Sequence, residues 1–196
     1  KGHVITPSSC AFAATVGHTT LPVRSKLRVA IIPTGDELTE PGVPLEPGKI
    51  YESNSIALAS LIRKAGAEPI VVKPLLDNKE SLYKTLDQCA EEADLILTSG
   101  GVSMGEKDLI RSSLIDRSAV IFWKVLMRPG GPPIFGHWNK TPIFGLPGNP
   151  VSSQTVFHLL LVPWISHPDI FYRRVIVKMK ERLRGAPNRL CLRRIK

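Results

Sequence analysis

The sequence predicts an α/β fold of three layers, with helices on both faces of a mostly parallel sheet. Two observations lead to this prediction. Between residues 26 and 168, short apolar runs rich in β-branched side chains alternate with segments whose apolar residues recur at helical spacing. The helical segments are long enough to return the chain across the sheet, and such returns join parallel strands by right-handed crossovers.

Four apolar runs and one hairpin are expected to form the sheet. The runs are dominated by Val, Ile and Leu, and they span residues 27–32, 68–72, 93–97 and 120–126. The hairpin is expected to pair residues 134–135 with residues 143–144.

The helices are marked by residues that satisfy free backbone groups at helix ends. We expect the first helix to run from Pro7 to Val16, because the Thr6 hydroxyl can cap it and Pro7 suits its first position. Gly66 is expected to end the second helix, and Asn78 to begin the third. The second to fifth helices are expected over residues 53–64, 79–91, 109–115 and 151–161.

The chain divides into three parts. We expect residues 1–25 to be too few to fold alone, residues 26–168 to be the α/β domain, and residues 169–196 to contain strands of a β domain. The sequence does not begin with Met, so we expect it to be part of a longer chain.

The net charge of +9 is concentrated at one end of the chain. Residues 171–196 contain ten of the Lys and Arg residues and one acid, and the acids and bases of the remaining residues balance. The basic residues of this segment alternate with apolar ones, which is typical of strands with one polar face. We therefore interpret them as a solvated face with room for one or two residues to lean into a ligand crevice, and we do not expect nucleic-acid binding.

The distribution of cysteines and histidines does not indicate a metal site. The three cysteines and five histidines show no metal-ligand spacing, so the cysteines are interpreted as free thiols in a reducing cytoplasm. The sequence also contains no apolar run long enough to span a membrane. We expect a cytoplasmic protein without a membrane partner.

Loops rich in small residues follow four of the strands and form the candidate ligand site. In residues 98–108, glycines and serines stand between a strand and a helix, where backbone N–H groups favour an anion. This loop ends in Glu106 and Asp108, and the loop after the first strand contains Asp36 and Glu37. A divalent cation that bridges such acids to phosphate would explain acids beside an anion site. Because the C-terminal ends of parallel strands form the ligand crevice of an open α/β sheet, we expect the loops to converge.

Four motifs in these loops together resemble the molybdopterin molybdotransferase family of the MoeA type, which includes the E domain of gephyrin. The motifs are Pro33–Leu38, Ser99–Asp108, Met127–Pro132 and Gly145–Ser152. The resemblance extends from about Thr6 to the end of the chain, and its specificity comes from the order and spacing of all four motifs. It implies a MogA-like molybdopterin-binding fold and a homodimer in the full-length protein. It also implies that residues 1–25 are the end of a preceding domain or a linker, and that residues 169–196 are the start of an incomplete C-terminal β-barrel domain.

The resemblance also implies an enzyme of molybdenum cofactor biosynthesis. Such enzymes insert molybdate into adenylylated molybdopterin and release AMP with the help of Mg²⁺, and this piece of chain alone is expected to be inactive. Glu37 and Asp108 match the cation-binding and catalytic acids of the family. The positions that match substrate-binding residues are Thr34, Gly35, Asp36, Ser99, Gly100, Gly101, Ser103, Arg128, Pro132, Pro147, Gly148, Asn149 and Ser152.

One loop departs from the family pattern. Relatives usually carry Lys where this chain has Gly131, and Arg128 stands in place of another Lys. The resemblance therefore predicts weaker molybdate binding, or a contribution from the basic C-terminal segment. Three residues also keep a simpler interpretation: Asp36 fits a turn, and Asn54 and Asn149 fit helix starts.

Two alternative functions remain open at this point. The loop Thr34–Leu38 also resembles the CinA-type nucleotide pyrophosphatase, although the Met127–Pro132 and Gly145–Ser152 motifs argue against it. Gephyrin shows that the same fold serves as a scaffold, so a non-catalytic binding protein is the second alternative. The acids Glu37 and Asp108 favour catalysis.

Overall fold

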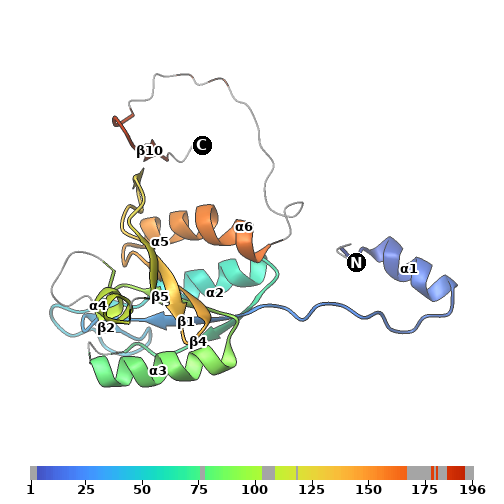
Figure 1. Cartoon of the computed structure of the whole chain (residues 1–196), viewed down its shortest axis with the longest axis horizontal. Coiled ribbons are helices and arrows are strands. Elements are labelled where there is room, and N and C mark those ends of the chain that lie inside the picture. The colour runs from blue at the N-terminus through green and yellow to red at the C-terminus, as the bar shows by residue number, and fades with distance from the viewer. Residues whose placement is uncertain are drawn as a thin grey trace.

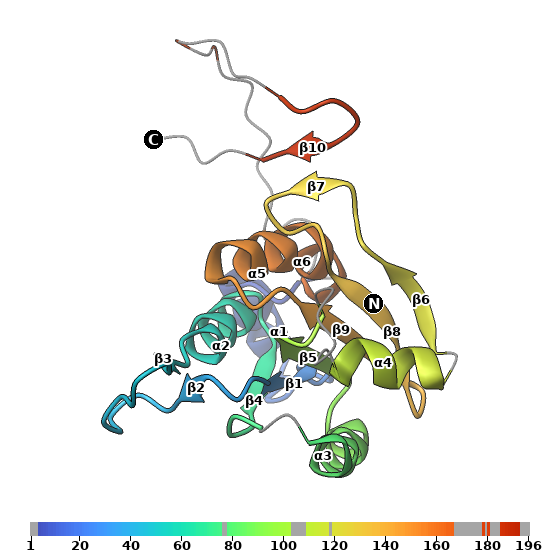
Figure 2. The same cartoon turned by 90° about the vertical axis from the view of Figure 1, so that its left-hand side faces the viewer.

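A computed structural model describes residues 4–75, 78–102, 109–117, 119–166, 178, 180 and 185–192. Its central feature is a six-stranded sheet with the strand order β4-β1-β5-β9-β8-β6 (Figure 2). The strands are β1 (Arg28–Pro33), β2 (Leu38–Thr39), β3 (Ile50–Tyr51), β4 (Glu68–Val71), β5 (Leu95–Ser99), β6 (Val120–Trp123), β7 (Met127–Arg128), β8 (Ile134–Trp138), β9 (Thr141–Leu146) and β10 (Leu190–Cys191). The helices are α1 (Pro7–Thr15), α2 (Asn54–Lys64), α3 (Lys79–Glu92), α4 (Leu109–Asp116), α5 (Pro150–Val156), the π-helical turn η1 (Phe157–Leu161) and α6 (Val162–Ile165).

The strand pairing confirms the predicted mostly parallel sheet. Strand β1 pairs in parallel with β4 and β5, and β5 pairs in parallel with β9. Strand β8 runs antiparallel between β9 and β6, so β6 points in the same direction as β9. The predicted hairpin is present, with Phe135 opposite Phe144. The C-terminal ends of β1, β5, β9 and β6 therefore meet at one edge of the sheet.

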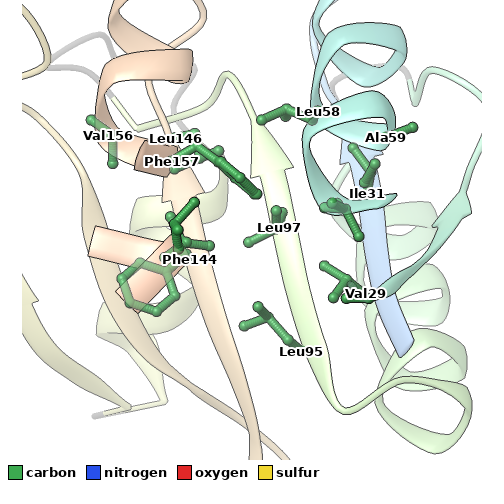
Figure 3. Packing of buried hydrophobic residues seen from close by; sticks show 14 of the residues in the cluster. Val29, Ile31, Leu58, Ala59, Leu95, Leu97, Phe144, Leu146, Val156 and Phe157 are labelled. Atoms are coloured by element: carbon green, nitrogen blue, oxygen red, sulfur yellow. The ribbon is translucent and has the colours of Figure 1, made fainter. Parts of the chain in front are cut away.

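The sheet separates two apolar cores, because alternate residues of a strand face opposite sides. On one side, Val29 and Ile31 of β1 and Leu95 and Leu97 of β5 pack against α2 and the α5–η1 segment (Figure 3). On the other side, the neighbouring strand residues pack against α3 and α4; they include Ala30, Ile32 and Ile96. This arrangement gives the three layers predicted from the sequence (Figure 2).

The predicted helix ends are also confirmed. The Thr6 hydroxyl accepts a hydrogen bond from the Ser9 N–H at 3.2 Å, and the Asn78 side chain accepts one from the Ser81 N–H at 3.0 Å. Gly66 follows α2 with a φ of +88°, a conformation that costs glycine little.

The last helical run is longer than predicted and contains a π-helical turn. It continues past Leu161 to Ile165 although Pro163 lies within it. Proline lacks the N–H that would bond four residues back, and its ring collides with the carbonyl group there. The wider turn, in which the Val162 N–H donates to the Phe157 carbonyl, accommodates this proline within one continuous run.

Three other elements differ from the sequence-based expectation. The run 120–126 forms a strand only to Trp123, and a separate short strand, β7, follows it. The loop after β1 contains the short parallel pair β2 and β3, which no periodic pattern marks. Strand β10 pairs in parallel with β7, and no closed barrel is formed by the described residues.

The N-terminal helix α1 lies apart from the sheet at the end of an extended segment (Figure 1). Its Phe12 is 71% exposed, and Ala13 is buried. The division of the chain into 1–25, 26–168 and 169–196 stays a prediction.

The buried strand residues set the stability of this scaffold. Leu97→Ala should lower the free energy of unfolding by about 2–5 kcal/mol, because Leu97 is fully buried between β1 and β9 and a cavity would remain. Urea denaturation checks this. Ile121→Ala is the control, since Ile121 is 59% exposed on the edge strand β6 and should change stability by less than about 1 kcal/mol. Equal losses in the two variants would contradict the assignment of the core.

Candidate functional site

The candidate site lies where β1, β5 and β9 end. The loops that follow these strands are Thr34–Glu37, Gly100–Val102 and Pro147–Asn149. The sheet hydrogen bonding continues into them, because the Thr34 N–H donates to the Ser99 carbonyl at 3.1 Å and the Gly100 N–H donates to the Leu146 carbonyl at 3.0 Å. The predicted convergence of these three loops is therefore observed (Figure 2).

The turn after β5 depends on two glycines. Gly100 and Gly101 have φ values of +104° and +65°, in the left-handed region that favours glycine. A Cβ on Gly100 would lie 2.5 Å from the Thr34 carbonyl oxygen, and a Cβ on Gly101 would lie 3.2 Å from the Thr34 hydroxyl. The turn can approach Thr34 this closely only without side chains.

The hydrogen-bond donors of this turn differ from the expectation. The Gly100 N–H is engaged within the sheet, so Gly100 supplies space rather than a donor. The Gly101 N–H makes no hydrogen bond with the described residues. The Thr34 hydroxyl, on a residue that is 8% exposed, likewise has no partner among them. An anion at this turn would satisfy such groups.

Asn54 connects two of the loops and was not recognised as more than a helix start in the sequence. Its side-chain Nδ2 lies 2.7 Å from the Ser99 hydroxyl and 2.7 Å from the Gly148 carbonyl oxygen. Ser99 is 3% exposed at the end of β5, and Gly148 belongs to the loop after β9. One side chain of α2 therefore holds both loops together.

The start of α2 is fixed by a buried carboxylate. Glu52 is 4% exposed, and it accepts hydrogen bonds from the Ser55 N–H at 2.9 Å and from the Ser55 hydroxyl. A carboxylate at this position also interacts favourably with the positive end of the helix dipole. These contacts fix the backbone from which Asn54 projects.

The loop after β1 carries the candidate acids. Glu37 is exposed, and a Cβ on Gly35 would lie 2.6 Å from its carboxylate, so the carboxylate occupies space that only glycine leaves open. Asp36 lies in a turn that the Leu38 N–H closes by donating to the Gly35 carbonyl at 3.2 Å, which agrees with its interpretation as a turn residue. The remaining acid Asp108 and the remaining serine Ser103 lie outside the described residues.

The loop after β9 leads directly into α5. The Asn149 side-chain oxygen accepts hydrogen bonds from Val151 and Ser152 N–H groups at 3.0 and 3.2 Å, so this oxygen caps the helix. Pro147 is buried. Ser152 lies beside the next loop, because a Cβ on Gly130 would be 3.3 Å from its carbonyl oxygen.

The loop from Arg128 to Pro132 forms a second, basic part of the edge. Arg128 is exposed, and Gly131 lies outside the left-handed region, so its conformation suits other residues. A pocket of about 220 Å³ beside Gly131 is lined by residues that include Lys124, Pro132 and Arg189. Strand β10 brings Arg189 next to this loop, and a contribution of the basic C-terminal segment to molybdate binding stays a prediction.

Three further findings concern the described part of the chain. No group of three or more His, Cys, Asp or Glu side chains is arranged to hold a metal ion there. None of the helices in that part is both long and apolar enough to cross a membrane. Burial raises the pKa of the Cys89 thiol to about 11, so this thiol stays protonated and is a core residue.

Comparison with known proteins agrees with the family resemblance of the four loop motifs. Residues 30–167 match the family described as probable molybdopterin binding domain. The chain is 42% identical over 169 residues to molybdopterin molybdenumtransferase 2 of Mycobacterium tuberculosis, covering 83% of this chain and 42% of the relative. It is 38% identical over 166 residues to molybdopterin molybdenumtransferase of Haemophilus influenzae, covering 85% and 41%. The chain thus spans about two fifths of the length of these relatives.

Solved structures show the same likeness. Two structures of the molybdopterin biosynthesis protein MoeA from Pyrococcus horikoshii have TM-scores of 0.73 and 0.64 at 36% and 32% identity. Each covers 84% of this chain, which corresponds to 41% and 39% of the solved chains. The protein CinA from Thermoplasma acidophilum has a TM-score of 0.54 at 11% identity, over 67% of this chain and 94% of that one, so it shares the fold alone.

The close approach of Gly100 to Thr34 can be tested by the loss of stability when a side chain is added at Gly100. Gly100→Ala should lower the free energy of unfolding by at least about 2 kcal/mol more than Gly42→Ala. Gly42 is a matched control, because its φ of +95° is similar and no atom lies within 4 Å of its Cβ position. Thermal and urea unfolding measure both variants. Similar losses would mean that the contact with Thr34 does not constrain the turn.

Proposed function

This chain belongs to the family of molybdopterin-binding domains, and from that premise we propose that it acts in molybdenum cofactor biosynthesis by binding a molybdopterin phosphate at the ends of β1, β5 and β9. The observation that carries this proposal is the cradle built by Thr34, Gly100, Gly101 and Gly148, which Asn54 holds together. Its Gly101 N–H and Thr34 hydroxyl, which have no partner among the described residues, suit phosphoryl oxygens.

The reaction that we propose is the one implied by the resemblance. Molybdate is inserted into the dithiolene of adenylylated molybdopterin, and AMP is released when the bond between the two phosphates breaks. The relatives named molybdopterin molybdenumtransferase support this proposal. The cradle would hold the phosphates, and binding in a fixed position lowers the entropic cost of reaction.

We further propose that Glu37 and Asp108 hold Mg²⁺ at the phosphates. Magnesium prefers carboxylate and phosphate oxygens, and the Glu37 carboxylate stands exposed at the mouth of the site over Gly35. A bound Mg²⁺ supplies positive charge for the phosphate that leaves. The side chains of this chain would orient the substrate and hold the cation beside it.

The molybdate half of the site is proposed at the basic loop. Ser152 of α5 lies beside Gly130, and Lys124, Pro132 and Arg189 line the pocket next to Gly131. Arg128 lines a second pocket with Cys191 of β10. Cations near an oxyanion stabilise it by charge-assisted hydrogen bonds. A homodimer of the full-length protein stays a prediction from the resemblance, and a cytoplasmic location stays a prediction from the cysteine pattern.

The alternatives are a CinA-type nucleotide pyrophosphatase, whose fold is shared, and a scaffold. Release of AMP from adenylylated molybdopterin by the full-length protein separates the three functions. We expect release that requires both Mg²⁺ and molybdate. Release that is indifferent to molybdate would favour the pyrophosphatase, and binding without release would favour the scaffold.

Removing either proposed cation-binding acid should stop this reaction. Glu37→Gln and Asp108→Ala should each reduce AMP release by at least about a hundredfold at saturating Mg²⁺, because the developing phosphate charge loses its counter-ion. Glu46→Gln is the control, since Glu46 is an exposed acid in the same connection between β1 and α2. Activity of either acid variant within threefold of wild type would remove it from the site.

A lysine at position 131 should strengthen oxyanion binding in the full-length protein. Gly131→Lys should tighten molybdate binding about tenfold, because a partly desolvated ammonium adds a charge-assisted hydrogen bond. Gly131→Ala is the control for the backbone: its Cβ would meet the Met127 carbonyl oxygen at 3.3 Å, with no left-handed strain. Calorimetry measures both variants. If the Lys variant binds molybdate no more tightly than the Ala variant, this loop does not face the oxyanion.

A further inference from the structure

We propose that Asn54 is a positioning residue that makes the Ser99 hydroxyl a hydrogen-bond donor to a phosphoryl oxygen of the ligand. This inference rests on the proposed function, and it concerns two residues, one of which the motifs do not include. Its basis is the pair of contacts that the Asn54 side chain makes with the ends of β5 and β9.

The orientation of the Asn54 amide is fixed by chemistry. A backbone carbonyl oxygen can only accept, so the group 2.7 Å from the Gly148 carbonyl must be the amide nitrogen. The same nitrogen lies 2.7 Å from the Ser99 hydroxyl oxygen. An amide nitrogen has two protons, and these two contacts use both of them.

The direction of the Ser99 hydroxyl follows from this arrangement. Because the Asn54 nitrogen can only donate, the Ser99 oxygen accepts, and its own proton must go elsewhere. Ser99 is 3% exposed, and its hydroxyl makes no second hydrogen bond with the described residues. A buried hydroxyl proton without an acceptor costs free energy, so this position favours a ligand atom that accepts.

The surroundings favour an anionic acceptor. Thr34 and Gly101 lie at the same turn, and the Gly101 N–H is a second donor without a partner among the described residues. A phosphoryl oxygen can accept hydrogen bonds from several donors at once, and its negative charge strengthens each of these bonds. Glu52 and Ser55 fix the start of α2, so Asn54 can keep the Ser99 hydroxyl proton directed toward the ligand without reorganising when the ligand binds.

A double-mutant cycle tests whether Asn54 acts through Ser99. AMP affinity of the full-length protein is measured by calorimetry for wild type, Asn54→Ala, Ser99→Ala and the double variant. We expect Asn54→Ala to weaken AMP binding about tenfold when Ser99 is present and less than about twofold in the Ser99→Ala background. Equal weakening in both backgrounds would overturn the inference, because Asn54 would then act only on the loop structure.

Two further variants keep the test decisive. If Asn54→Ala does not fold, Asn54→Asp replaces it, since this isosteric change turns the donor into an acceptor and should draw the Ser99 proton away from the ligand. Asn78→Ala is the matched control: it removes an asparagine that caps α3, and AMP affinity should stay within twofold of wild type. A loss of AMP affinity in this control would show that helix stability alone explains the effect.

The source of the phosphoryl oxygen is resolved by a second probe. The same cycle is run with inorganic pyrophosphate in place of AMP. Coupling with AMP assigns the Ser99 donor to the nucleotide phosphate, and coupling with pyrophosphate alone assigns it to the bridge between the phosphates. Absence of coupling with both ligands overturns the inference. A wild-type protein that binds neither ligand would instead contradict the proposed function.

Discussion

The contact between Thr34 and the turn after β5 is the constraint on which the site depends. The Thr34 N–H extends the pairing of β1 with β5, and its carbonyl oxygen occupies the space beside Gly100. Gly100 in turn donates its N–H to the carbonyl oxygen of Leu146, the last residue of β9 before the third loop. Three loops are therefore held in one arrangement by backbone groups and by the lack of a side chain. Such an arrangement is formed before a ligand arrives, which lowers the cost of binding.

The sheet makes this arrangement rigid. Alternate residues of β1 and β5 are packed against helices on both faces, so neither strand can shift without opening one of the two cores. The helices α2 and α5 also begin at the edge where the site lies, and their first residues, Asn54 and Pro150, follow residues that fix the helix starts. The packing of the helices against the sheet and the fixed helix starts at its edge thus position the same three loops of the site.

The sequence predicted what periodicity and local chemistry can encode. The strands, the caps at Thr6 and Asn78 and the meeting of the loops follow from spacing and from rules for helix ends. The role of Asn54 does not, because an asparagine at a helix start has the same local pattern whether or not it bonds to distant loops. The two-residue strands β2 and β3 are too short to show a periodic pattern. The general rule that proline ends a helix predicts a helix end before Pro163, whereas a π-helical turn allows the helical run to continue past it.

The parallel order of the strands has a consequence for how the chain folds. Arg28 at the start of β1 bonds to Asp94 before β5, and these residues are 66 positions apart. Contacts so distant in sequence require large loops to close before they contribute stability, and they slow folding. The contacts that hold the cradle are of this kind, because Asn54 bonds to Ser99 and Gly148, which are 45 and 94 positions away. We therefore expect the cradle to form late in folding, and a ligand to stabilise the finished state by mass action.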